Sequence, residues 1–246
     1  ILLLTLLLLL IYCGKDNSKQ KHKTINVSND PYHIKTYFCI ASVEIYYNDK
    51  LKSCRIKEPV QINGLSCKDY VKFHENGAFK ACYIYKPYTY KNHIVFQGYV
   101  KYYDNGNLES CTISKDAIIN DINIGKDSKI RLSENGIIKK INRNTEKVKT
   151  NGLIIPANSV IEFDTKLKYK NTDQPALSEI DFDFPISINN TLYACDVKLN
   201  NGTVYQGTII DELLIDNLLL PPYTTFVIKH NHLEIIRIRN PFTLNN

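Results

Sequence analysis

Three carboxylates alternate with apolar residues in the segment SEIDFDF, which contains Glu179, Asp181 and Asp183. On a β-strand this alternation places all three on one face. Carboxylate oxygens are ligands that Ca²⁺ prefers, so the segment is a weak candidate for a calcium site. Ca²⁺ takes about six to eight oxygen ligands, more than one strand supplies, and a solvent-exposed strand face is the favoured interpretation. We therefore expect no metal and no cofactor.

Signatures of catalytic and nucleotide-binding sites are absent from the sequence. The chain has no phosphate-binding loop, dinucleotide fingerprint, nucleophile elbow or HExxH motif. No Cys-x-x-Cys pair or Cys/His spacing indicates zinc. We therefore expect a protein that is not an enzyme.

Three of the seven cysteines occupy one equivalent position in segments of similar sequence. Cys54, Cys82 and Cys111 stand where a fourth segment has Ile141, which indicates an inward-facing position. A free Cys at such a position behaves as a small apolar residue. Equivalent cysteines lying side by side suit a disulfide torsion of about 90° poorly, so we favour buried free thiols over disulfides. The state of the other internal cysteines stays open: Cys39, Cys67 and Cys195.

The printed chain begins with a run dominated by Leu and Ile, followed by Tyr12 and Cys13. The run is shorter than the roughly 20 residues of a membrane span and has the length of a signal-peptide core. The segment that follows, GKDNSKQKHKTINVSND, is strongly polar and is typical of a flexible tether. Because Met is absent from the chain, we interpret the sequence as a fragment without its first residues.

This order of apolar core, single Cys and polar tether resembles a bacterial lipoprotein signal, in the looser form known from spirochaetes. The resemblance implies that the thiol of Cys13 is acylated and that the preceding residues are removed. Leu10 and Ile11 fit the pattern, whereas Tyr12 stands where Gly, Ala or Ser is usual. Buried acyl chains contribute about 0.8 kcal/mol per methylene, so two or three chains hold a protein firmly at a membrane. The alternatives are a plain secretory signal with an incidental Cys and a retained helical anchor.

Similar segments recur along the chain and predict a β-hairpin each. The four clearest start 28, 29 and 30 residues apart, at Val43, Val71, Val100 and Ile130. Weaker copies start at Val160, Asp196 and Phe226. A fixed period of about 20–50 residues is typical of stacked repeat arrays.

Each unit combines a turn, a bulge and a later apolar run. A two-residue Asn-Gly turn would supply the positive φ angles of a tight hairpin. A step of three between apolar residues of the return strand predicts a β-bulge, and runs such as IINDINIG predict a third strand. The predicted turn residues are Asn48, Asn76, Gly77, Asn105, Gly106, Asn135 and Gly136. The predicted core positions are Val43, Val71, Val100, Ile130, Cys54, Cys82, Cys111 and Ile141.

The strings YYDNGNLES and FHENGAFKA resemble a MORN-repeat variant of YwqK-type antitoxin-like repeat proteins, in which a YYxNGxLK core recurs. The resemblance covers about half of each unit, the period here is longer, and further glycines of that family are missing. It implies an array of β-hairpins, and we carry over no antitoxin activity. We expect an all-β fold, a repeat array of roughly 28–31-residue β-hairpin units stacked as an extended sheet or β-solenoid.

Composition and charge agree with an exported all-β protein. The chain is 43% hydrophobic and holds 17 Tyr, which favours strands around a core. Its net charge of +6 is uneven, with eight basic and three acidic residues in 125–150 but four and ten in 160–220. The basic stretch would suit anionic lipid, lipopolysaccharide or a sulfated glycan. Ordinary outward-facing strand positions are the favoured explanation.

We therefore expect four parts: a signal core at 1–12, a lipidated Cys and flexible tether at 13–36, a β-repeat array at 37–239, and a tail at 240–246. The protein would be a membrane-anchored lipoprotein of the bacterial envelope, facing the periplasm or the surface from the outer membrane. It would act as a non-catalytic binding or structural module with a protein or glycan partner and no nucleic acid. The alternatives are an intracellular MORN-like interaction protein and an envelope enzyme with an unrecognised site.

Overall fold

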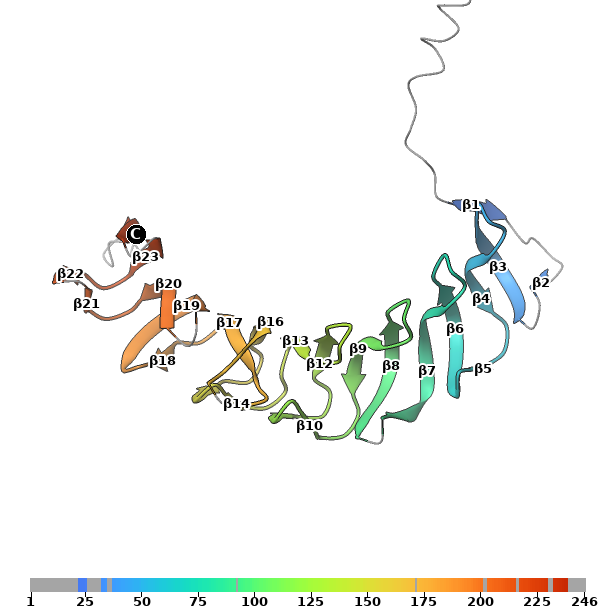
Figure 1. The fold of residues 1–246 in the computed structure, drawn as a ribbon, viewed down its shortest axis with the longest axis horizontal. Helices are drawn as coiled ribbons and strands as arrows, with labels where there is room; N and C mark the ends of the chain where they lie inside the picture. Colours follow the sequence, from blue (N-terminus) through green and yellow to red (C-terminus); the bar gives the residue numbers. More distant parts are fainter. Residues whose placement is uncertain are drawn as a thin grey trace, which may run out of the picture.

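The chain forms an elongated, curved body of β-strands that follow one another in sequence order, from β3 at one end to β23 near the other (Figure 1). The computed structural model describes residues 22–25, 32–34, 37–91, 93–170, 172–200, 203–215, 217–229 and 232–238. All regular elements in these ranges are strands, so the predicted all-β fold is confirmed. Within the described part of the chain, no helix has the length and apolar character needed to cross a bilayer.

The main sheet is antiparallel, and each long strand pairs with the next long strand of the chain. Short turns connect most of these strands, which is the connection that antiparallel pairs allow. The strands are β3 (Tyr37–Tyr46), β4 (Leu51–Ile56), β6 (Leu65–Phe73), β7 (Phe79–Tyr90), β8 (Ile94–Tyr102), β9 (Leu108–Ile113), β12 (Lys129–Leu132), β13 (Ile138–Asn142), β16 (Val160–Lys168), β17 (Pro175–Asp181), β19 (Thr191–Asn200), β20 (Thr203–Ile209), β23 (Thr224–Lys229) and β24 (His232–Ile238).

A second family of short hairpins lies between the long ones, where we predicted a single third strand. The prediction is wrong because a two-residue turn interrupts each apolar run. In IINDINIG, Asn120 and Asp121 have φ angles of 49° and 59°, which a two-residue hairpin turn requires. The short strands are β5 (Val60–Ile62), β10 (Ala117–Ile119), β11 (Ile122–Ile124), β14 (Val148–Thr150), β15 (Leu153–Ile155), β18 (Ile186–Ile188), β21 (Leu213–Ile215) and β22 (Leu218–Leu220).

Two further strands lie within residues 13–36, where the sequence predicts a flexible tether. β1 (His22–Ile25) and β2 (Tyr32–Ile34) both pair antiparallel with β3. β3 is the first long strand of the sheet, and an edge strand offers unpaired N–H and C=O groups to any extended segment nearby. The structure therefore differs from the predicted tether at these residues, because pairing with an open edge does not need an apolar sequence.

A β-bulge follows the start of the return strand in the four clearest segments, which confirms the predicted step. In the β6–β7 hairpin, Phe73 pairs with Phe79 and Lys72 pairs with Ala81, so Lys80 has no residue opposite. An extra residue on one strand resets the alternation of faces, and residues on both sides of the bulge point into the core. The same shift leaves three further residues unpaired: Lys52, Glu109 and Lys139.

A row of apolar residues crosses the sheet from strand to strand. Because side chains alternate along each strand, residues in one row of the register share a face. All eight predicted core positions are at most 4% exposed. Directly opposite residues join two runs, Cys54, Val71, Cys82 and Val100, and then Cys111, Ile130, Ile141, Ile161, Ile180 and Val197.

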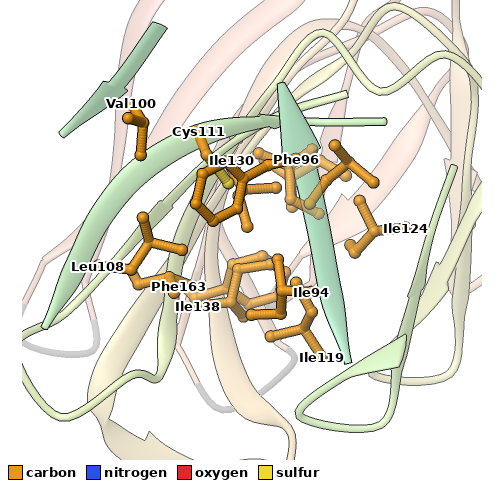
Figure 2. Close-up of a cluster of buried hydrophobic side chains, with 14 of the residues drawn as sticks. Ile94, Phe96, Val100, Leu108, Cys111, Ile119, Ile124, Ile130, Ile138 and Phe163 are labelled. Carbon is orange, nitrogen blue, oxygen red and sulfur yellow. The ribbon is translucent and has the colours of Figure 1, made fainter. Parts of the chain in front are cut away.

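The long strands and the short hairpins share one core. Figure 2 shows Phe96 and Ile94 of β8 among side chains that include Ile119 and Ile124 of the short β10–β11 hairpin. Phe96 is completely buried, and burial of a side chain of this size contributes roughly 2–3 kcal/mol. The short hairpins thus cover the inner face of the long strands and leave the other face to solvent.

The Asn-Gly segments close the long hairpins with a longer turn than we predicted. Between β6 and β7, the N–H of Gly77 donates to the carbonyl of His74, and the N–H of His74 donates to the carbonyl of Ala78, both at 2.8 Å. Gly77 has a φ of 91°, whereas Asn76 is not in the left-handed region. Instead, Asn76 Oδ1 accepts the N–H of Ala78 at 2.8 Å. The loop is a type I turn followed by a left-handed Gly, so Asn serves through its side chain.

Neighbouring turns of the long hairpins are hydrogen-bonded to one another. The amide of Asn48 donates to the carbonyl of Glu75 at 3.1 Å, and that of Asn107 donates to the carbonyl of Glu134 at 2.8 Å. Both bonds join residues 27 positions apart, close to the spacing of the similar segments. These contacts hold successive turns in line along one edge of the body.

Candidate functional site

Four cysteines form two disulfides, Cys39–Cys54 and Cys67–Cys82, each joining residues 15 positions apart. The preference for free thiols at Cys54 and Cys82 is therefore wrong. Cys39 lies opposite Ile56, so Cys54, two residues earlier on the same face, is its diagonal neighbour. The Cα atoms are 5.9 Å apart in the first pair and 5.7 Å in the second, distances that disulfides span. Cys54 and Cys82 do not bond to each other or to Cys111, because each bonds to the cysteine 15 residues earlier in its own long hairpin.

Cys111 is a buried free thiol, as predicted. Fifteen residues earlier the chain has Phe96, which pairs with Ile113 in the register that the partner cysteines hold in the two disulfides. Burial raises the pKa of the Cys111 thiol to about 12, so the thiol is neutral and unreactive near pH 7. Cys195 is also free and half-buried, and burial raises its pKa as well.

The predicted metal candidates do not gather further ligands. Glu179 lies opposite Glu162 on one side and Lys198 on the other, and Asp181 and Asp183 are exposed. Among the described residues, no group of three or more His, Cys, Asp or Glu side chains is placed to hold a metal ion. The predicted lipidation site, Cys13, lies outside the described residues.

The solvent-facing side of the sheet carries a group of exposed tyrosines on β6, β7 and β8. We call this group the outer patch; it consists of Tyr70, Tyr83, Tyr85 and Tyr99, which are 38–46% exposed. Tyr83 lies directly opposite Tyr99, and their ring centroids are 5.1 Å apart. Desolvation and the neighbouring Tyr83 phenol raise the pKa of Tyr99, so its hydroxyl stays neutral at physiological pH.

Basic side chains lie beside the outer patch. Arg55 is opposite Tyr70, and Lys68 is opposite Tyr83. The carboxylate of Glu109 is buried at the bulge on β9. Its Oε1 atom pairs with two cations of the same face. These are Lys101, at 2.8 Å, and Arg131, at 3.1 Å. The four cations, Arg55, Lys68, Lys101 and Arg131, outnumber the carboxylates of Glu109 and the exposed Asp69, so this part of the face is positively charged.

A pocket of about 400 Å³ lies where the β5–β6, β6–β7 and β8–β9 turns meet the end of the β7 strand. We call it the tyrosine pocket. Its lining residues are Asn63, Ala78, Phe79, Tyr88, Tyr90, Tyr102, Asp104, Asn105 and Gly106. The ring of Tyr102 is 5.6 Å from that of Phe79 and 6.3 Å from that of Tyr90, measured between centroids.

The tyrosines of the pocket are positioned by the end of the β7–β8 hairpin. The register of the two strands shifts between Ile84 and Tyr88, which separates the end of the hairpin from its base. The hydroxyl of Tyr90 accepts the N–H of Leu108 at 3.3 Å and donates to Asn107 Oδ1 at 3.4 Å. No local sequence pattern indicates this pocket, because its residues come from separate turns that only the folded chain brings together.

The phenol groups of the pocket lie close together in a poorly solvated place. Burial raises the pKa of Tyr102, and the nearby Tyr88 and Tyr90 phenols raise it further. Tyr102 therefore keeps its proton across the physiological pH range. A neutral phenol both donates and accepts hydrogen bonds.

Comparisons with known proteins found no match for this chain among family models, curated proteins or solved structures. The outer patch and the tyrosine pocket are the two candidate sites among the described residues. Both combine aromatic rings with polar groups, and neither contains a nucleophile paired with a base.

Proposed function

We propose that the chain is an exported lipoprotein, held at the bacterial envelope by an acylated Cys13, that acts as a non-catalytic binding or structural module. The outer patch carries this proposal: exposed tyrosines lie beside Arg55 and Lys68 on the solvent-facing side of the sheet. Tyr and Arg are enriched at binding surfaces because they combine a large apolar area with hydrogen bonding. An anionic glycan or an acidic protein surface fits this chemistry.

The two disulfides support export. Disulfides persist in oxidising places such as the periplasm and the cell surface, and are rare in the cytosol. Cys39–Cys54 and Cys67–Cys82 lie in the described core. In a reducing cytosol these four cysteines would be free thiols. This observation favours the envelope over the alternative of an intracellular MORN-like interaction protein.

We further infer that the body is a stacked repeat array, an extended sheet or β-solenoid of similar hairpin units. Hydrogen bonds between turns at a separation of 27 residues support this, as does the row of buried residues that crosses the strands. Each unit would add one long and one short hairpin. Such arrays offer broad, extended surfaces, which suits a binding module.

The anchor is tested by labelling cells with a palmitate analogue. We expect label on the wild-type protein and none on Cys13→Ser, because the thiol is the acylated atom. The serine variant should also leave the membrane fraction for the soluble one. Unlabelled wild-type protein would contradict the lipoprotein assignment. Degradation by protease added to intact cells would place the protein on the surface, and degradation only after lysis would place it inside the envelope.

The binding role is tested by screening the purified chain against anionic glycans and envelope or matrix proteins. We expect a partner whose affinity falls at least about tenfold in Tyr83→Ser/Tyr99→Ser, since each aromatic contact contributes about 0.5–1.5 kcal/mol. The matched control is Phe184→Ser, which removes an aromatic ring that is 65% exposed elsewhere on the molecule. Equal loss in both variants, or in neither, would contradict the assignment of the outer patch.

A further inference from the structure

We propose that the tyrosine pocket binds a neutral saccharide, with a sugar ring against its tyrosines and sugar hydroxyls on its amides, phenols and Asp104. This deepens the proposed function by giving a ligand class to a second site, and it rests on the chain being a binding module. The outer patch and the pocket differ in charge and shape, so each can be altered separately.

The shape and lining of the pocket suit a small ring-shaped ligand. Its volume of about 400 Å³ lies within the range of about 300–1,000 Å³ typical of ligand pockets. Tyr88 and Tyr90 are half-buried, so part of each aromatic side chain is open to a ligand. The C–H groups on one side of a sugar ring carry a slight positive charge, which the negative face of an aromatic ring attracts.

The polar groups of the pocket match sugar hydroxyls. A sugar hydroxyl donates and accepts hydrogen bonds at once, and phenols and amides do the same. Asn63 and Asn105 provide amides, and the Asp104 carboxylate provides an acceptor that can take two hydroxyls. A ligand with hydroxyl groups around an apolar ring therefore satisfies both halves of the lining.

The aromatic pair is specific to this hairpin among the described short hairpins. Where β7 has Tyr88 and Tyr90, the equivalent strand β5 has Val60 and Ile62. Four other first strands place non-aromatic residues at both register positions: Ala117 and Ile119, Val148 and Thr150, Ile186 and Ile188, Leu213 and Ile215. β2 has one aromatic residue, Tyr32, with Ile34 at the second position. Aliphatic side chains thus suffice to cover the core at these positions. Packing alone therefore does not require a pair of tyrosines.

An organic cation is the competing ligand for a cluster of tyrosines, and the pocket suits it less well. The Nζ of Lys91 already lies 5.2 Å from the ring centroid of Tyr90, and its charge would repel a second cation. A quaternary ammonium has no hydroxyls to offer, so the amides of Asn63 and Asn105 would lose water without gaining partners.

The charge of the lining also separates this pocket from the outer patch. Asp104 is the one charged residue among those lining the pocket. Because Lys91 lies beside the pocket, its charge and that of Asp104 offset each other, so neither an anionic nor a cationic ligand gains over a neutral sugar. We therefore expect neutral sugars in the pocket and anionic partners at the outer patch.

The test compares variants of the full chain on a glycan array and in titrations with free oligosaccharides. Tyr88→Val/Tyr90→Ile installs the residues that β5 carries at these positions, so the hairpin keeps apolar side chains that the same fold accepts. We expect its affinity for a neutral saccharide to fall about tenfold or more, as two aromatic contacts are lost. Asp104→Asn should weaken binding less, and Tyr83→Ser/Tyr99→Ser should leave it unchanged. Circular dichroism and thermal unfolding check that each variant folds.

The outcomes separate this inference from the proposed function. Loss of neutral-sugar binding in the pocket variant alone supports the inference. Sugar binding that is lost only in the outer-patch variant overturns it and leaves the binding module in place. Binding of choline in preference to sugars, or binding of no neutral saccharide by the wild-type chain, overturns it as well, whereas the protein screen still tests the outer patch.

Discussion

Two parts of the sheet fill the same position in different ways. From β3 to β8 the core row contains cysteines bonded to partners 15 residues earlier, whereas from β12 to β17 it contains Ile130, Ile141, Ile161 and Ile180. Cys111 on β9 stands between these parts with the cysteine but without the bond, because Phe96 replaces its partner. An inward position in the sheet therefore accepts a half-cystine, a free thiol or an Ile, and the residue 15 positions earlier decides which chemistry results.

The largest effect should come from removing bulk in the aliphatic part. Ile130 is 1% exposed and lies between Cys111 and Ile141, so Ile130→Ala should lower the free energy of unfolding by about 2–5 kcal/mol. Urea denaturation measures this change. The matched control is Ile118→Ala, at a residue that is 64% exposed, for which we expect less than about 0.5 kcal/mol. Similar values for the two variants would show that the row does not form the core.

Removing a disulfide from the cysteine-containing part should lower the free energy of unfolding slightly less. Cys67→Ala/Cys82→Ala opens a link across 15 residues, for which the unfolded chain gains entropy worth about 3 kcal/mol. The same denaturation experiment measures the loss. Under a reducing agent the wild-type chain should lose most of its advantage over the variant. A variant as stable as the oxidised wild type would mean that the two sulfurs are not bonded.

The comparison is sharpened by restoring the missing partner. Phe96→Cys should form a third disulfide with Cys111, because position 96 has the register of the bonded cysteines. Mass spectrometry after alkylation should show that Cys111 is no longer free. The link contributes about 3 kcal/mol, which offsets most of the lost Phe bulk, so the oxidised variant should lie within about 2 kcal/mol of wild type. Phe96→Ala is the control, and it should be destabilised by about 3–5 kcal/mol. Continued alkylation of Cys111 in the oxidised variant would disprove the equivalence.

Removing the ion pairs of Glu109 on β9 should have a moderate effect on the free energy of unfolding. Glu109→Ala leaves Lys101 and Arg131 without their shared carboxylate, but both cations are partly exposed and water screens them. We expect a loss of about 1 kcal/mol that shrinks in high salt. Glu109→Gln, which keeps the shape and removes the charge, should lose a similar amount. A loss that salt does not change would point to packing at the bulge instead.

The smallest effect should be the pH dependence of the free thiol. Burial raises the pKa of Cys111 from 9.0 to about 12, so the folded state holds the proton more tightly than the unfolded state. The stability that the protonated thiol contributes to the folded state is complete below pH 9 and is lost as the pH rises from 9 toward 12. Cys111→Val should therefore gain stability relative to wild type between pH 9 and 10, on the order of 1 kcal/mol. Parallel pH profiles would contradict burial of this thiol.

Local features of the fold could be predicted because neighbouring residues determine them. Alternation of apolar residues predicted the long strands, and the step of three, as from Phe79 to Cys82, predicted the bulge. The Asn-Gly turn was located but its geometry was not, since Asn76 acts through a side-chain hydrogen bond rather than a positive φ. The second turn within IINDINIG was visible in principle, because Asn120 and Asp121 are residues that tolerate left-handed angles.

The sequence by itself determined the strand content, the spacing of similar segments and which residues face inward, because a strand's two faces follow from its alternation. Only the tertiary structure decided that Cys54 bonds to Cys39, since the pairing of Cys39 with Ile56 makes the two cysteines diagonal neighbours across two strands. It also decided that Tyr88, Tyr102 and Asp104 line one pocket. Contacts between residues from separate turns depend on how the hairpins fold over one another, and no local pattern in the chain encodes that geometry.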